Sequence, residues 1–428
     1  MSVRERAAAA TADSPTVEPS PRADTVAEQQ RSARRIAVVA ISYIARRDGI
    51  SVYTESLLVE FLAAAREAGR ALTIDVFACG DAAEILEKRL IARLGEDPGT
   101  PVAVNVIATA GDGLRTKYLE IPTRVRRGRY DAVVLPNLQP VWLPADRTLA
   151  ILHDLTYRVA APHFPFWRRV YMDLLTRFWL MRTRTVGCIS ESGEADLLRY
   201  YPASARRRRL QLPNGLPEKI AAQPRPSTDE TERALTDNVI DLLFVGRLNR
   251  LKGFDRICHL CEWLEAYCAE QGITARIHVV GKDTAESAEL LGALRCNHVS
   301  LERHGYLDDE ALNALYRRSG FCLFFSRNEG FGLPVLEGIW QGCVPLLSDI
   351  GVFREVMGEG YPLFADDERG QSATVAFIHR VRTDAAYRGE ILARMEDALS
   401  RWETGYARAA RRLLDWAQRP AAKKGEVT

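Results

Sequence analysis

The sequence predicts an α/β protein made of two successive domains, each built on a parallel β-sheet. Short apolar runs of strand length alternate with longer stretches of helical periodicity, a pattern typical of parallel sheets covered by helices. This series is interrupted once, by a Pro/Gly/Asn cluster at 212–217. With 428 residues, the chain is long enough for two such domains.

Composition and charge exclude several classes of protein. The chain is 47% hydrophobic and 27% charged, and its net charge of +2 gives no reason to expect nucleic acid as a partner. No run of 18 apolar residues is present, so we expect no transmembrane helix. Residues 1–32 lack the apolar core of a signal peptide and predict a disordered extension. The eight scattered cysteines favour a reducing, cytoplasmic location.

Six apolar runs predict the strands of the first domain, which we expect to span residues 33–212. They lie at 35–42, 72–78, 102–108, 132–136, 149–152 and 185–190. The first run is followed by a glycine-containing loop and by a helix from about 51 to 68. This order of strand, loop and helix is typical of mononucleotide-binding units.

A second α/β series predicts another domain over residues 213–400. Its strands are expected at 239–245, 275–281, 299–304, 321–325 and 343–348, and its helices at 254–272, 308–319 and 335–340. The polar stretch 221–237 is expected to be an interdomain linker and a loop. The tail from 384 to 417 predicts a helix with aromatic side chains able to dock it on a domain, and residues 401–428 form the last segment.

The stretch from Phe324 to Gly338 is the strongest candidate for a functional site in this sequence. It predicts a strand, a polar glycine-containing loop and a helix that begins near Pro334. The free N–H groups at the start of this helix make the loop suited to an anion or a polar ligand. Glu329 and Glu337 flank the turn. They either lie in a solvated loop and complement the helix dipole, or accept hydrogen bonds from the hydroxyls of a sugar nucleotide.

The sequence from Glu329 to Glu337, Glu-Gly-Phe-Gly-Leu-Pro-Val-Leu-Glu, resembles the E-x7-E signature of the retaining glycosyltransferases of family 4 (glycosyl transferases group 1). The resemblance implies the GT-B fold: two Rossmann-like domains facing across a cleft, with a C-terminal helix docking back. It implies that the first domain holds the acceptor and the second binds the nucleotide sugar. It covers almost all of 35–417 and is strongest in the second half.

Two basic residues follow a strand of the second domain. Arg247 and Lys252 lie at the carboxyl edge where α/β sheets bind ligands, and both side chains suit phosphate oxygens. A solvated basic loop is the simpler interpretation. However, their setting resembles the family's G-R-L-x(3)-K-G loop, which binds the donor diphosphate. The resemblance further implies donor contacts from Gly49, Gly330, Phe331, Gly332 and Leu333, from Glu329 to the sugar hydroxyls, and from Glu337 to the ribose.

His153 follows the run 149–152, at the carboxyl end of a predicted strand. The family has a similarly placed histidine that touches the donor sugar near its reacting carbon, so the resemblance implies that role for His153, with Asp154 as an alternative contact. His153 and Glu329 are therefore the implied catalytic residues. We name no protein nucleophile, because retaining enzymes of this fold are thought to react on the front face of the sugar.

No metal or cofactor is expected. The sequence contains no Asp-x-Asp pair of the kind that usually clamps a metal on a diphosphate. Cys258, Cys261 and Cys268 superficially suggest zinc, but their helical spacing favours a buried helix face. A GDP- or UDP-linked sugar is then a substrate and not a cofactor.

Two basic regions suggest a further partner. The stretch from Phe164 to Arg184 combines aromatic side chains with arginines, and 206–209 is a run of four arginines. A packed helix with a solvated face explains these features simply. The functional interpretation is peripheral contact with the inner face of a membrane, which would bring a lipid-linked acceptor to the cleft.

The predicted function is transfer of a hexose from a nucleotide sugar to a saccharide or lipid-linked glycan, as in polysaccharide biosynthesis. GDP-mannose is the first donor we expect. A sugar-nucleotide 2-epimerase of the same fold, an NAD-dependent dehydrogenase and a non-catalytic glycosyltransferase-like subunit remain alternatives. The complete E-x7-E with Arg247 and Lys252 favours the transferase. The third glycine of the dinucleotide fingerprint is missing after Gly330-x-Gly332, which argues against the dehydrogenase.

Overall fold

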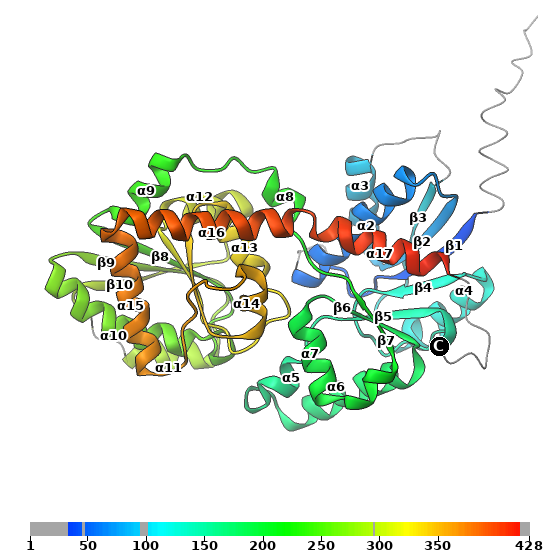
Figure 1. Cartoon of the computed structure of the whole chain (residues 1–428). Helices are drawn as coiled ribbons and strands as arrows, with labels where there is room; N and C mark the ends of the chain where they lie inside the picture. Colours follow the sequence, from blue (N-terminus) through cyan, green and yellow to red (C-terminus); the bar gives the residue numbers. More distant parts are fainter. Residues whose placement is uncertain (1–32, 45–47, 95–101, 294–295, 420–428) are drawn as a thin grey trace, which may run out of the picture.

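The computed structural model describes residues 33–44, 48–94, 102–293 and 296–419. Two parallel β-sheets lie next to each other in space, each covered by helices, and a long C-terminal helical segment runs along both (Figure 1). The extension predicted at 1–32 lies outside the described residues.

The first sheet has seven parallel strands in the order β3-β2-β1-β4-β5-β6-β7. The chain therefore turns from one side of β1 to the other, and the crevice at such a switch point is where α/β sheets bind ligands. The strands are β1 (Arg34–Val39), β2 (Leu72–Cys79), β3 (Val102–Thr109), β4 (Ala132–Leu135), β5 (Thr148–Leu152), β6 (Thr185–Cys188) and β7 (Arg208–Gln211). Six of them were expected from apolar runs.

The seventh strand, β7, is an addition to the predicted fold. It pairs with β6 over four residues and consists of Arg-Arg-Leu-Gln, with only Leu210 buried. An edge strand with one buried side chain leaves no apolar run, so the arginines at 206–209 were interpreted only as a basic region.

Helices cover both faces of the first sheet. Asp48 begins α2 by accepting a hydrogen bond from the Ser51 N–H, and Ser190 begins α7 by accepting one from the Gly193 N–H. The helices are α2 (Gly49–Glu67), α3 (Gly80–Leu94), η1 (Thr116–Glu120), α4 (Ile121–Gly128), η2 (Ala145–Arg147), α5 (Thr156–Val159), η3 (Ala161–His163), α6 (Phe166–Arg182), α7 (Glu191–Tyr200) and η4 (Pro202–Arg206).

The second sheet has five parallel strands in the order β10-β9-β8-β11-β12, with its switch point between β8 and β11. The strands are β8 (Val239–Val245), β9 (Thr274–Val280), β10 (Val299–Gly305), β11 (Phe321–Phe324) and β12 (Val344–Leu347). The helices are α8 (Glu218–Ala221), α9 (Thr228–Thr236), η5 (Arg250–Lys252), α10 (Phe254–Gln271), α11 (Ala285–Ala293), α12 (Asp309–Arg318), α13 (Leu333–Trp340), α14 (Gly351–Met357) and α15 (Glu368–Thr383). Cys258, Cys261 and Cys268 lie on the buried face of α10, as their spacing predicted.

The prediction of a loop over 221–237 was wrong, because this stretch contains helix α9. Ser227 accepts a hydrogen bond from the Glu230 N–H, and the Glu230 carboxylate accepts one from the Ser227 N–H, which completes a capping box. Only Leu235 of this helix is buried. The apolar signal was thus too weak to reveal the helix, whereas Ser-x-x-Glu at 227–230 was a usable start signal.

The C-terminal segment forms two helices, α16 (Ala385–Glu403) and α17 (Gly405–Gln418), where the sequence predicted one. The first lies along the second domain, and α17 packs on α2 of the first domain (Figure 1). This confirms that the C-terminus docks back. At the crossing, the Leu216 N–H donates to the Trp402 carbonyl at 2.9 Å, and the Tyr406 hydroxyl donates to Asn214 Oδ1 at 2.9 Å.

We predict that Gly215→Ala destabilises the protein, because a Cβ there would lie 2.7 Å from the Tyr406 nitrogen and 2.9 Å from the Trp402 oxygen. Overpacking of this kind costs roughly 1–3 kcal/mol of the free energy of unfolding, measured by urea titration. Gly389→Ala is the matched control, since its Cβ meets nothing within 4 Å on an exposed face of α16. Equal unfolding midpoints for the two variants would contradict the prediction.

Candidate functional site

A cleft of about 440 Å³ lies between the two domains. Its walls come from the strand ends and helices of the first domain and from the loops after β8 and β11 of the second. The lining residues are Ile50, Asn137, Leu138, Gln139, Leu152, His153, Asp154, Thr156, Tyr157, Phe164, Arg168, Tyr171, Met172, Leu175, Thr176, Leu251, Lys252, Asn328, Glu329 and Gly330. Four residues singled out from the sequence, His153, Lys252, Glu329 and Gly330, therefore share one cavity.

An ion pair joins the loops that follow β8 and β11. Lys252 Nζ donates to Glu329 Oε1 at 2.6 Å, and the Ser326 hydroxyl donates to the same oxygen at 2.7 Å. The ammonium group has three N–H bonds, so two remain for a ligand in the cleft. Glu329 Oε2 likewise remains available to accept from a hydroxyl.

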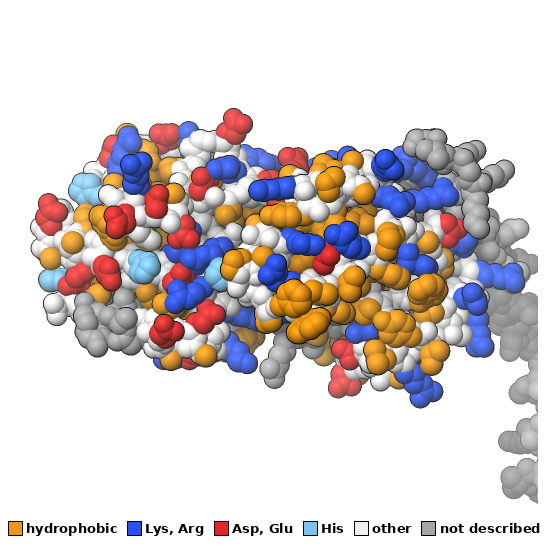
Figure 2. Space-filling model, turned by 90° about the horizontal axis from the view of Figure 1, so that it is seen from below, with side chains coloured by type: hydrophobic (Ala, Val, Ile, Leu, Met, Phe, Trp, Pro, Cys, Tyr) orange, Lys and Arg blue, Asp and Glu red, His pale blue; other side chains and the backbone are white. Residues whose placement is uncertain are grey.

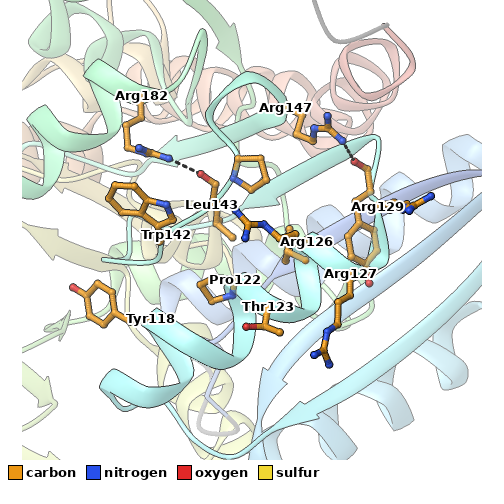
Figure 3. Close-up of a pocket in the computed structure, with 13 residues that line it drawn as sticks. Tyr118, Pro122, Thr123, Arg126, Arg127, Arg129, Trp142, Leu143, Arg147 and Arg182 are labelled. Atoms are coloured by element: carbon orange, nitrogen blue, oxygen red, sulfur yellow. Dashed lines mark hydrogen bonds between the residues drawn. The ribbon is translucent and has the colours of Figure 1, made fainter.

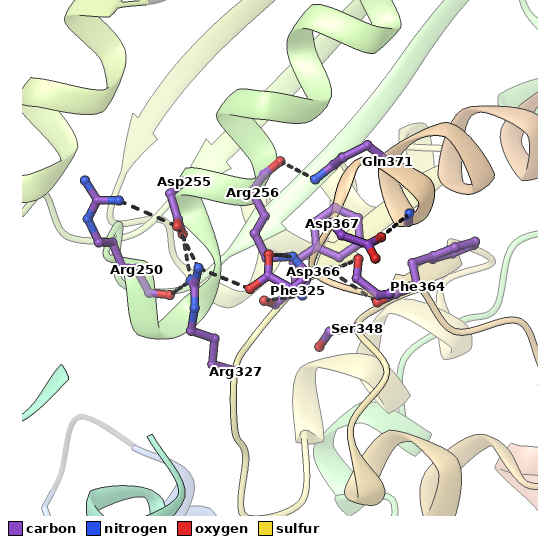
Figure 4. Close-up of polar contacts among 12 residues, drawn as sticks. Arg250, Asp255, Arg256, Phe325, Arg327, Ser348, Phe364, Asp366, Asp367 and Gln371 are labelled. Atoms are coloured by element: carbon purple, nitrogen blue, oxygen red, sulfur yellow. Dashed lines mark hydrogen bonds and ion pairs between the residues drawn. The ribbon is translucent and has the colours of Figure 1, made fainter. Parts of the chain in front are cut away.

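A buried polar network holds these two loops together (Figure 4). The Arg327 guanidinium makes two hydrogen bonds of 2.8 Å with the Asp255 carboxylate, and Arg256 donates to the Phe325 carbonyl at 3.3 Å. Gly253 has φ +74°, and a Cβ there would lie 2.1 Å from the Phe325 carbonyl oxygen. Glycine is therefore required where the loop after β8 touches the loop after β11.

The remaining phosphate-binding candidates lie beside this network. Arg247 is exposed at the carboxyl end of β8, outside the cleft lining, and its side chain has no hydrogen-bond or ion-pair partner among the described residues. Arg250 lies 3.7 Å from Asp255, so its charge is partly matched within the protein. Of the two arginines, Arg247 is consequently the more available to bind a phosphate group.

The glycine turn leads into α13. Gly332 has φ +94°, where an L-residue is strained, and it is followed by Leu333 as the first helical residue. The Phe331 side chain is buried and packs edge-on against Trp402 of α16, with ring centroids 4.8 Å apart. The side chain of Phe331 thus anchors the C-terminal helix, and only its backbone is free to contact a ligand.

Glu337 lies one turn into α13 and is half-buried. Burial raises the pKa of its carboxyl, while Lys219 opposes the shift. No described residue hydrogen-bonds or pairs with this carboxylate. A half-buried carboxylate without a protein partner is suited to accept hydrogen bonds from a polar ligand.

His153 presents a neutral imidazole at the cleft. Its Nε2 lies 2.7 Å from the Pro136 carbonyl oxygen, which can only accept, so the proton resides on Nε2 and Nδ1 is an acceptor. Burial lowers the pKa of the imidazole. The Tyr53 ring holds it edge-on at 4.9 Å. Asp154 accepts a hydrogen bond from the Thr156 N–H at 2.8 Å, just before α5.

Direct contacts bring the first domain against the Glu329 loop. The Ser190 hydroxyl donates to the Gly330 carbonyl at 2.9 Å, and Asn328 Nδ2 donates to the Thr156 hydroxyl at 2.8 Å. A Cβ on Gly330 would lie 2.8 Å from the His153 carbonyl oxygen. Sequence reasoning missed Ser190 and Thr156, although both follow strands of the first sheet, the signal that revealed His153.

Gly49 is the first residue of α2, directly after the capping Asp48. A Cβ there would meet nothing within 4 Å, so close packing does not require glycine at this position. Its neighbour Ile50 lines the cleft. Gly49 is therefore placed at the cleft edge, whereas residues 45–47 of the preceding loop lie outside the described part.

Comparison with solved structures defines the class of fold. The chain superposes on Anabaena HepE in complex with UDP-glucose with a TM-score of 0.59 and 16% identity, covering 89% of this chain and 99% of that one. It superposes on WaaG, a glycosyltransferase involved in lipopolysaccharide biosynthesis, with a TM-score of 0.55 and 17% identity, covering 90% and 99%. The fold is GT-B.

Comparison of sequences adds the family of the second domain. Residues 228–385, which lie in the second domain, match the family model of the glycosyl transferases group 1. The serotype-specific mannosyltransferase WbdA of Escherichia coli is 26% identical over 268 residues, which is 59% of this chain. The match covers 32% of WbdA, about a third of its length.

None of the helices in the described part of the chain has the length and apolar composition that a membrane crossing requires.

We predict that Glu337→Gln stabilises the ligand-free protein at neutral pH. Because folding raises the pKa of Glu337, the wild type loses stability as pH rises from the unfolded pKa through the folded pKa. The variant should therefore melt at a higher temperature than the wild type at pH 7, and the difference should shrink towards pH 4. Glu87→Gln, on the exposed face of α3, is the control. Identical melting temperatures at pH 7 would refute this.

Proposed function

We propose that the chain is a retaining glycosyltransferase of family 4 that moves a hexose from a nucleotide-diphosphate sugar to a saccharide or lipid-linked acceptor. The observation that carries the proposal is the 2.6 Å pair of Lys252 and Glu329, which lines the cleft together with His153. In this cleft, Lys252 is a cation that can bind a phosphate and Glu329 is a carboxylate that can accept from sugar hydroxyls. His153, from the first domain, adds a neutral hydrogen-bond acceptor.

Lys252 and Arg247 bind the donor diphosphate. Breaking the bond between sugar and phosphate leaves negative charge on the departing diphosphate, and a positive charge held near it lowers the barrier. The ammonium group of Lys252 and the guanidinium of Arg247, which has no side-chain partner in the described part of the chain, supply that charge from the second domain. This arrangement needs no metal ion.

The two carboxylates of the E-x7-E stretch orient the donor. Glu329 accepts hydrogen bonds from hydroxyls of the sugar ring, next to the backbone N–H groups of Gly330, Phe331 and Gly332. Glu337, which has no protein partner among the described residues, accepts from the ribose hydroxyls. Two anchors on either side of the diphosphate fix the reacting carbon in the cleft.

His153 contacts the donor sugar from the first domain. Its Nδ1 accepts a hydrogen bond from a sugar hydroxyl, because Nε2 is committed to Pro136. The acceptor hydroxyl attacks the sugar carbon from the face that the diphosphate leaves, and a phosphate oxygen of the leaving group takes the acceptor proton. The sugar therefore keeps its configuration without a covalent intermediate on the protein.

Mannose is the first donor sugar we propose, supported by the similarity to a mannosyltransferase over 59% of the chain. We place the acceptor on the side of the first domain and the protein in the cytoplasm, in peripheral contact with the inner face of a membrane. A role in polysaccharide biosynthesis follows from an acceptor of this kind.

Thermal unfolding with a panel of UDP, GDP, ADP and NAD tests the donor site. The panel is run in EDTA, since the proposed site needs no metal. We expect one nucleoside diphosphate to raise the melting temperature, because a ligand at about 100 times its dissociation constant adds about 2.7 kcal/mol to the free energy of unfolding. A shift with NAD alone, or no shift at all, would show that the site is wrong.

We predict that Lys252→Ala lowers sugar transfer by at least about a hundredfold, because it removes a charge from the departing diphosphate. Transfer is measured with the radiolabelled sugar of the nucleotide that the panel identifies, using an oligosaccharide or lipid extract as acceptor. Lys88→Ala is the control, because among the described residues this side chain pairs with Glu84 alone, on the surface of α3. Near-normal turnover of a folded Lys252→Ala protein would refute the role of Lys252.

A further inference from the structure

A second cavity, of about 900 Å³, lies in the first domain between α4 and the segment that leads into β5 (Figure 3). Five arginines line it and no Asp or Glu does, among the residues described. Arg129 and Arg147 stand on one side, Trp142 and Arg182 on the other, and Arg126 lies between them. For a chain with a net charge of +2, this is a strong local concentration of one sign. We call this cavity the arginine pocket.

The positive charge of the arginine pocket is mostly unmatched. Arg147 donates to the Tyr130 carbonyl at 2.7 Å and Arg182 to the Leu143 carbonyl at 2.8 Å, which positions the guanidinium groups without neutralising them. Asp146 approaches Arg147 at 3.7 Å from outside the lining. The side chains of Arg126, Arg127 and Arg129 form no hydrogen bond or ion pair with other described residues. Such a site is suited to phosphate groups.

Exposed apolar side chains border the arginine pocket. Trp142 and Tyr118 both line it, yet their exposed fractions are 56% and 48%. Leu114 and Leu119, close to Tyr118 in the sequence, are also exposed, and so is Trp167 at the start of α6, which is 78% exposed. Figure 2 shows the hydrophobic side chains gathered over the half of the molecule formed by the first domain, with Lys and Arg among them.

Helix α6 connects the arginine pocket to the cleft. At the end of α6, Arg182 stacks over the Trp142 ring at 4.1 Å and over Phe178 at 5.3 Å. Earlier in the same helix, Arg168 and Tyr171 line the cleft of the candidate site. One surface of aromatic and arginine side chains therefore extends from the cleft mouth to the arginine pocket.

We propose that this surface docks on a bilayer that carries anionic phospholipids, with lipid phosphates in the arginine pocket. Tyr and Trp rings are favoured at the level of lipid headgroups, and each basic side chain near an anionic membrane strengthens binding to it. The mixture of exposed apolar rings and unmatched arginines fits a bilayer, which offers apolar and anionic surface together. The inference rests on the proposed function, because docking here would bring a lipid-linked acceptor to the cleft.

Co-sedimentation with vesicles tests the proposal without measuring transfer. We expect the full chain to bind vesicles of phosphatidylcholine with phosphatidylglycerol, and to bind vesicles of phosphatidylcholine alone much more weakly. The triple variant Arg126→Ser, Arg127→Ser, Arg129→Ser should lose more than about tenfold in affinity for the anionic vesicles. Its matched control replaces three exposed arginines of the second domain, Arg233→Ser, Arg317→Ser and Arg369→Ser, and should bind as the wild type does.

The apolar contribution is tested by Trp167→Ser, with Trp263→Ser on α10 as its control. Only Trp167→Ser should weaken binding to the anionic vesicles.

Equal binding of the wild type to neutral and anionic vesicles, or an equal loss of affinity in both arginine triple variants, would overturn the proposal. The shift in melting temperature with the nucleoside diphosphate should persist in every variant, which shows that each is folded. If that shift is absent from the wild type while vesicle binding follows the arginine pocket, the proposed function fails and the docking surface stands.

Discussion

The close approach of the loops after β8 and β11 is the constraint on which the candidate site depends. Gly253 lets the first loop touch the Phe325 carbonyl, and the paired hydrogen bonds of Arg327 and Asp255 prevent the loops from separating. Only because of this contact do Lys252 and Glu329, which are 77 positions apart in the sequence, form a 2.6 Å pair. Removing one member of a buried ion pair leaves the other charge buried without a partner. The Arg327–Asp255 pair therefore positions the two loops and also neutralises the charges that it buries.

The two walls of the cleft have different electrostatic characters. The second domain contributes Lys252 and Glu329 to the cleft and carries Arg247 at the same sheet edge, whereas the first domain contacts the Glu329 loop through the neutral groups of Ser190, Thr156 and His153. The lowered pKa of His153 favours its neutral imidazole at this contact, while Asp154 and Arg168 of the first domain line the cleft further along. The groups of the first domain that touch the Glu329 loop are thus neutral, and the Lys252–Glu329 ion pair comes from the second domain.

Local pattern predicted most of the fold and part of the site. Strand β8 and the buried face of α10 follow from apolar periodicity, and the E-x7-E stretch marked Glu329 and Glu337. The sequence did not reveal β7 or α9, because each of these elements buries a single apolar residue. It also did not reveal the break between α16 and α17. Ser190 and Thr156 matter because of contacts between domains, and such contacts depend on how two separately folded sheets meet. The side chain of Phe331 faces Trp402 for the same reason.

The crossing of 212–217 with 402–406 joins the domains through two chain segments at one place. The second domain is therefore attached to the first where it begins and again where the chain returns, since α17 packs on α2 beyond the crossing. A domain held by one linker alone would have a single attachment. Here the double attachment supports the direct contacts at the cleft, where the His153 carbonyl lies beside Gly330.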